Sequence, residues 1–173
     1  MTPMEQHLKL SKSSGESLSS TESTRYRSIV RSLIYLTSTR PDIAYVVQVV
    51  SQFMSSPRTL HMDAVHRILR YLKGTAQVGI YFPSSGDLSL TAYADADYAG
   101  CLHTRRSTSR WLVKLGSSVI SWQCKKQDRV AKSSTEAEYR WMSEVISELV
   151  WLHRLLEELG LCVLYQSGCT PIM

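Results

Sequence analysis

The spacing of apolar residues changes from a helical to a strand-like repeat near Gly74. Before this glycine, apolar residues recur every three to four positions, which predicts helices over residues 26–39, 42–54 and 60–73. Pro41 is suited to the start of the second helix, and Gly74 to the end of the third. The first half of the chain is therefore predicted to be helical.

After Gly74, apolar and polar residues alternate, as on a half-buried strand. The clearest alternation runs over residues 88–97 and places Leu88, Leu90, Ala92, Ala94 and Ala96 on one face. Other predicted strands are 78–82, 109–115 and 119–125, and a long helix is predicted over 134–159, ended by Gly160.

This order of elements predicts an α+β protein in three parts. Residues 1–24 are rich in Ser and Thr in their second half and are predicted to be a flexible lead-in. Residues 25–83 form a helical segment, and residues 84–173 hold the sheet and the long helix.

The net charge of +5 is unevenly distributed. Residues 105–132 contain eight Lys and Arg residues and a single Asp, a local charge of +7. Such a block favours a polyanionic partner such as nucleic acid, although a solvated sheet face would explain it as well.

The composition excludes membrane proteins and disulfide scaffolds. No apolar run reaches the ~18 residues of a membrane span, and the N-terminal residues lack the apolar stretch of a secretory signal. The four cysteines show no C-x-x-C spacing, which favours free thiols. We therefore expect an intracellular protein, cytoplasmic or nuclear, without a membrane partner.

Two carboxylates are candidates for chemistry on the strand over residues 88–97. Asp95 and Asp97 lie two residues apart, so they share one face and repel each other unless a cation or donors compensate. A divalent metal ion would do so, because hard cations prefer carboxylate oxygens. The alternative is a strand end that opens into solvent.

Glu138 is a second candidate, on the long helix. At ~100° per residue, six apolar residues fall within roughly 60° of it: Met142, Val145, Leu149, Leu152, Leu156 and Leu159. This pattern predicts that Glu138 faces inward and needs a partner, whereas Glu136 faces solvent. A metal ion shared with Asp95 and a capping box between Thr135 and Glu138 are equally good interpretations.

Several motifs, in order, resemble a known family. YADADYAG (residues 93–100), TRRSTS (104–109) and SSTEAEY (133–139) resemble the RNase H domain of copia-type retrotransposon Pol polyproteins. Upstream, TRPDIA (39–44) and RILRYLKGT (67–75) resemble the segment that connects reverse transcriptase to that domain.

The resemblance implies metal-dependent hydrolysis of the RNA strand of an RNA–DNA hybrid by two Mg²⁺ or Mn²⁺ ions held on carboxylates. Matched residue by residue, Asp95 is similar to the first-strand aspartate and Glu138 to the helix glutamate. The basic block would hold backbone phosphates of the hybrid. Its implied nucleic-acid-binding residues are Arg105, Arg106, Lys125, Lys126 and Arg129.

The sequence also departs from the family. The third and fourth catalytic aspartates of the family would lie beyond residue 173, so we expect an incomplete RNase H-like fold of three strands and one long helix. In this fold the later strands pair beside the first, and their loss would leave residues 88–97 as an exposed edge. At most weak binding of one ion and no activity are then expected. Arg31 and Arg110 replace glycines usual in the family, and Arg110 is expected to cost stability.

Two other functions are compatible with parts of the sequence. The first is a non-catalytic module that binds nucleic acid or an intact retrotransposon polyprotein. The second is an effector-like protein, because Arg67–Arg70 matches an R-x-L-R pattern. The second is disfavoured by the absence of a signal peptide and by the expectation that Ile68 and Leu69 belong to a helix core.

Overall fold

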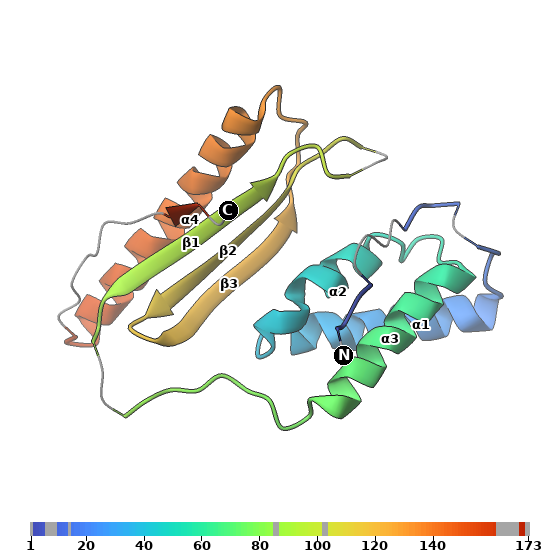
Figure 1. Ribbon diagram of the computed structural model, residues 1–173, viewed down its shortest axis with the longest axis horizontal. Helices are drawn as coiled ribbons and strands as arrows, with labels where there is room; N and C mark the ends of the chain where they lie inside the picture. Colours follow the sequence, from blue (N-terminus) through green and yellow to red (C-terminus); the bar gives the residue numbers. More distant parts are fainter. Residues whose placement is uncertain are drawn as a thin grey trace. The chain divides into compact units, whose positions relative to one another are not determined.

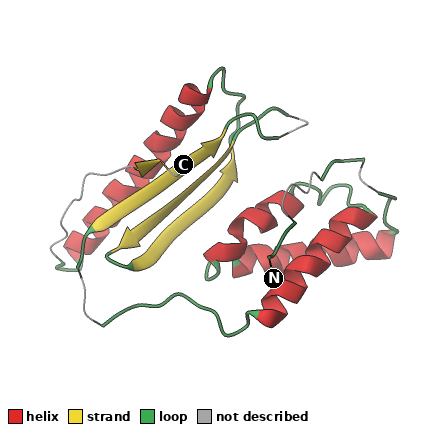
Figure 2. Cartoon of the chain, viewed as in Figure 1, coloured by secondary structure: helices red, strands yellow, loops and turns green. Residues whose placement is uncertain are grey.

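The computed structural model describes residues 2–5, 10–13, 15–84, 87–101, 104–161 and 170–171. The chain divides into two compact units, Met1–Gly79 and Ile80–Met173, each with its own apolar core. Helices make up the first unit, and a sheet with one long helix makes up the second (Figure 2). This arrangement is compatible with the predicted α+β class.

The first unit contains the three predicted helices with shifted ends. They are α1 (Ser20–Leu36), α2 (Ala44–Ser51) and α3 (Thr59–Gly74), and a 3₁₀ turn, η1 (Pro41–Ile43), precedes α2. Pro41 does begin the second helical segment, because its fixed φ suits a helix start. The core that the helices share contains Tyr26, Val30, Leu33, Ile43, Val46, Val47, Val50, Met62, Ala64, Val65 and Ile68.

Helix α1 begins six residues earlier than the apolar pattern indicates. The Ser19 hydroxyl accepts a hydrogen bond from the Glu22 amide at 3.3 Å, and the Glu22 carboxylate accepts one from the Ser19 amide at 3.0 Å. This capping box satisfies amides that would otherwise lack partners. The Glu16 amide also donates to the Thr59 hydroxyl at 3.1 Å. Residues 20–24 of the Ser-rich stretch are thus helical, and Glu16 is bonded to α3.

The second unit contains a sheet in the order β3-β2-β1-β4. Its strands are β1 (Leu90–Asp97), β2 (Thr108–Leu115), β3 (Ser118–Lys126) and the short β4 (Thr170–Pro171). The first three are antiparallel, and Leu90 and Ala92 are buried as the alternation predicts.

Two expectations about this sheet are corrected. Residues 78–82 form no strand, and the side chains of Val78, Tyr81 and Phe82 are exposed. The Tyr81 carbonyl accepts a hydrogen bond from the Ser118 hydroxyl instead of from a neighbouring strand. In addition, β1 is not left as a bare edge, because β4 pairs with it in parallel at Tyr93 and Ala94.

Helix α4 (Ser134–Glu158) covers one face of the sheet (Figure 1). Gly160 follows its end with φ +77°, a conformation that glycine adopts without strain. Helix and sheet share a core of Leu90, Ala92, Trp111, Val113, Trp141, Val145, Leu152 and Leu156. None of the helices in the described ranges is both long and apolar enough to cross a membrane.

Candidate functional site

The candidate residues gather at the end of the sheet where β1 ends, β2 begins and β3 ends. Asp97 pairs with Thr108 across β1 and β2, and Thr108 pairs with Lys126 across β2 and β3. The Gln127 amide group donates to the Ser109 hydroxyl at 2.8 Å and to the Ala137 carbonyl of α4 at 3.0 Å. These bonds fix the start of α4 at the same end of the sheet.

Asp95 is bound to an arginine. Its strand partner is Arg110, whose Nε and Nη2 atoms both lie 2.7 Å from the same carboxylate oxygen, Oδ2. The Asp95 side chain is 26% exposed and that of Arg110 47%. The guanidinium group of Arg110 thus compensates the negative charge of Asp95, as the sequence predicts that a cation or a donor must do.

Asp97 is the last residue of β1 and is exposed. Its carboxylate covers Gly100, where a Cβ atom would collide with it. Between them the chain turns through Ala99, which has φ +52° and whose amide donates to the Ser107 hydroxyl at 3.2 Å. At Asp97, the interpretation as a strand end open to solvent is therefore supported.

Glu138 is exposed, so the prediction that it lies on the buried stripe of α4 is wrong. The buried side chains of this helix are Ala137, Trp141, Val145, Leu152 and Leu156. This stripe is rotated toward Ala137 and Trp141, because Trp141 packs on β2 and its Nε1 donates to the Arg110 carbonyl at 2.8 Å. The six apolar residues counted on the helical wheel from Glu138 include neither Ala137 nor Trp141.

The cap of α4 is formed by Ser133 and Glu136, two residues before the predicted pair of Thr135 and Glu138. The Ser133 hydroxyl accepts from the Glu136 amide at 3.1 Å, and the Glu136 carboxylate accepts from the Lys132 amide at 2.6 Å. The Lys132 amide, with the charge of Arg140, holds the pKa of Glu136 below its usual value. The sequence carries two overlapping S/T-x-x-E patterns here, and only the first is used.

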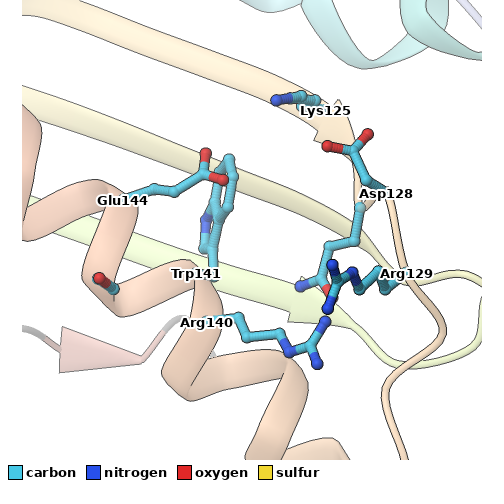
Figure 3. A pocket seen from close by; sticks show the side chains of 8 residues that line it. Lys125, Asp128, Arg129, Arg140, Trp141 and Glu144 are labelled. Carbon is cyan, nitrogen blue, oxygen red and sulfur yellow. The ribbon is translucent and has the colours of Figure 1, made fainter.

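Basic residues line a cleft of about 400 Å³ between the end of β3 and α4. Figure 3 shows Lys125, Arg129 and Arg140 around it, together with Asp128 and Glu144. Lys125 and Arg129 were predicted to bind nucleic acid; Arg140 was not, because it lies outside the basic block. Trp141 supplies an aromatic wall.

The other three predicted binding residues lie around Cys101, outside this cleft. The Arg105 amide donates to the Cys101 carbonyl at 2.8 Å, and the Cys101 amide donates to the Arg106 carbonyl at 3.2 Å. The Lys126 ammonium lies 2.7 Å from the Cys101 sulfur. The five predicted binding residues are thus divided into two groups at one end of the sheet.

The described residues, as arranged, do not fit a resident metal ion. Asp95 already holds a guanidinium group, and within the described part of the chain no three His, Cys, Asp or Glu side chains are grouped to bind a metal. Cys124, the partner of Arg110 on β3, is a thiol whose pKa burial raises to about 11, so it is not a thiolate ligand near neutral pH. Cys101 is also a thiol, and the other two cysteines lie outside the described residues.

The R-x-L-R match at Arg67–Arg70 lies on α3. Ile68 is buried, as expected, but Leu69 is 38% exposed, so the expectation that both belong to the core is wrong for Leu69. Arg67 forms an ion pair with Glu5 at 2.6 Å.

The chain is similar to Pol polyproteins of plant transposons. It is 51% identical over 160 residues to the retrovirus-related Pol polyprotein from transposon RE1 of Arabidopsis thaliana, which covers 92% of this chain and 11% of that protein. It is 45% identical to the corresponding protein from transposon TNT 1-94 of Nicotiana tabacum, over 92% of this chain and 12% of that protein. The chain thus spans about a tenth of the length of these relatives.

A further relative is much shorter. The secreted RxLR effector protein 161 of Plasmopara viticola is 48% identical over 128 residues, which make up 73% of this chain and 90% of that protein. No family model and no solved structure matches the chain.

Proposed function

We propose that the sheet unit is an RNase H-like domain, because over 92% of its length the chain is 45–51% identical to retrovirus-related Pol polyproteins from transposons. In the same proposal, residues 25–83 correspond to the segment that connects reverse transcriptase to that domain. The strand order supports the assignment, since the fourth strand lies beside the first, as the resemblance implies. The long helix between β3 and β4 supports it as well.

The ancestral activity in this proposal is hydrolysis of the RNA strand of an RNA–DNA hybrid, with Mg²⁺ or Mn²⁺ supplying Lewis-acid activation of water and stabilisation of the leaving group. Asp95 and Glu138 are the corresponding catalytic residues. In the present chain we propose that the hybrid is bound without being cleaved. The observation that carries this proposal is the ion pair between Asp95 and Arg110, which gives the carboxylate a resident cation.

Binding is proposed to use the basic residues at this end of the sheet. Lys125, Arg129 and Arg140 line one cleft, and their positive charges suit contacts to backbone phosphates. Asp128 and Glu144 in the same cleft moderate the charge, so we expect moderate affinity and a clear dependence on salt.

The test combines binding and cleavage of a fluorescein-labelled RNA–DNA hybrid by the full chain. The double variant Lys125→Gln/Arg129→Gln should bind more weakly, and its slope of log affinity against log salt should fall by about one for each phosphate that is no longer neutralised. The matched control is Arg154→Gln, an exposed arginine on α4 that does not line the cleft.

Cleavage is measured in Mg²⁺ and in Mn²⁺ with Asp95→Asn and Glu138→Gln variants alongside. We expect no cleavage by the unmodified chain. Cleavage that both variants abolish would overturn the proposed lack of activity. Failure to bind the hybrid at low salt would overturn the proposed binding and favour an interaction with an intact polyprotein.

A further inference from the structure

The Asp95–Arg110 pair is fixed by the backbone of the sheet. The two residues lie directly opposite each other, and the β1–β2 register is continuous from Leu90 with Leu115 to Asp97 with Thr108. Strand β2 is held on its other side by β3, where Arg110 pairs with Cys124. Neither side chain can be carried away from the other without breaking this antiparallel ladder.

Arg110 is also anchored from the opposite face of the sheet. Its carbonyl accepts a hydrogen bond from Trp141 Nε1 at 2.8 Å, and Trp141 is 3% exposed within the core between helix and sheet. The neighbours Ser109 and Trp111 are buried, whereas Arg110 is exposed. Its main chain is thus tied to α4 while its side chain extends along the other face to Asp95.

The guanidinium group occupies one oxygen of the Asp95 carboxylate, Oδ2. Two N–H groups converge on one oxygen of Asp95 at 2.7 Å, the length of a charge-assisted hydrogen bond. A divalent ion at this carboxylate would either displace the guanidinium or bind beside a like charge a few ångströms away. Both alternatives weaken its binding.

We propose that the guanidinium group of Arg110 prevents divalent cations from binding to Asp95, and that an uncharged side chain at position 110 allows them to bind. The inference rests on the proposed function, because it takes Asp95 as the metal-binding carboxylate. In this inference Arg110 weakens the binding of divalent cations at Asp95, and replacing Arg110 restores that binding.

The experiment follows Mn²⁺ binding by paramagnetic broadening of amide signals in the ¹⁵N-labelled full chain. In Arg110→Gln, the Asp95 signal should broaden at about tenfold lower Mn²⁺ concentration than in the unmodified chain, since the variant removes both the ion pair and the repulsion. Arg110→Thr should do the same with a side chain that favours strands. Adding Asp95→Asn to either variant should abolish the gain.

The matched control is Arg67→Gln, which removes the arginine from another ion pair of the chain, that with Glu5 at 2.6 Å. It should leave broadening at Asp95 unchanged. Circular dichroism would establish whether each variant is folded. A measurement on the unmodified chain complements the variants: the Arg110 Nε–H signal should persist in millimolar Mg²⁺.

Equal Mn²⁺ sensitivity at Asp95 in the unmodified chain and in a folded Arg110 variant would overturn the inference, as would loss of the Arg110 Nε–H signal in Mg²⁺. The proposed function fails separately, in the hybrid-binding assay. If an Arg110 variant binds Mn²⁺ more tightly at Asp95 but the chain does not bind the hybrid, the role of Arg110 is supported and the proposed function is wrong.

Discussion

Arg40 is a buried charged residue of the helical unit, and Asp42 balances its charge. Nε and Nη2 of Arg40 donate to the two oxygens of Asp42 at 2.9 and 2.7 Å, while its Nη1 donates to the Thr75 carbonyl at 3.0 Å. The Tyr71 hydroxyl donates to Asp42 at 2.8 Å. This network joins the loop before α2 to the end of α3, and it gives a structural role to two polar residues of the TRPDIA motif.

Asp42→Asn should lower the free energy of unfolding by about 1–3 kcal/mol, because Arg40 is left buried with a weaker partner. The hydrogen bonds from Arg40 hold the pKa of Asp42 below its usual value. The contribution of Asp42 is therefore complete above the unfolded pKa of about 3.9 and is lost as the pH falls below it. Urea denaturation at pH 7 and pH 3 measures both effects.

The control for Asp42 is Glu5→Gln, which removes the partner of Arg67 from an ion pair whose carboxylate is 60% exposed. Exposed pairs contribute about 0–1 kcal/mol, so this variant should unfold almost as the unmodified chain does. An equal loss of stability in the two variants would contradict the importance given to the burial of Arg40.

His61 is buried at the start of α3 and is predicted to make the helical unit sensitive to acid. Its ring stacks on Phe53 with centroids 3.9 Å apart, its Nδ1 accepts from the Arg58 amide at 3.0 Å, and its Nε2 lies 2.9 Å from the Ser11 carbonyl. This geometry requires the neutral ring with the proton on Nε2. Burial lowers the pKa of His61, and the charge of Arg58 lowers it further.

Because the folded pKa of His61 lies below the unfolded value of about 6.5, its contribution is complete above that pH and is lost as the pH falls below it. The midpoint temperature of thermal unfolding should therefore decrease when the pH is lowered from 7 to 5. His61→Gln keeps an acceptor for the cap and should flatten this dependence. His66→Gln, at an exposed position of the same helix, should leave it unchanged.

At the scale of the element, the first turn of α4 depends on one of two overlapping caps. Ser133→Ala should cost about 1 kcal/mol, because the Glu136 amide loses its acceptor. Thr135→Ala should cost less than about 0.5 kcal/mol, because Thr135 is exposed and already within the helix. Amide hydrogen exchange at residues 136–138 measures the difference, and faster exchange in Thr135→Ala than in Ser133→Ala would contradict it.

The elements that were predicted correctly from the sequence are those with a strong internal repeat. The alternation from Leu90 to Asp97 has apolar residues on one side throughout, and burial follows it at Leu90 and Ala92. The ends of helices were less predictable, because side-chain hydrogen bonds such as that of Ser19 decide them. Residues 78–82 have the composition of a strand, but a strand also requires a neighbour to pair with, and the pattern does not specify one.

The sequence identified Asp95 and Arg110 separately, but it did not predict that they form an ion pair. Asp95 could be singled out from its motif, and Arg110 from its departure from the family. That they face each other depends on the register of β1 against β2, which is set by the packing of both strands on α4. The exposure of Glu138 could not be predicted for a similar reason: Trp141, by packing on β2, determines the rotation of the helix.

At the scale of the whole molecule, the two units should separate on proteolysis. Their cores share no residue, and the segment between α3 and β1 exposes Tyr81 by 80% and Phe82 by 62%. Chymotrypsin cleaves after exposed aromatic residues, whereas Tyr26 is fully buried in the helical core. Brief digestion should therefore cut first after Tyr81, because Pro83 protects the bond after Phe82. Mass spectrometry would show this cut, and the N-terminal fragment should keep a helical circular dichroism spectrum. Tyr81→Ser/Phe82→Ser should slow this first cut, and cleavage first at Tyr26 or within β1–β3 would show that the units do not fold separately.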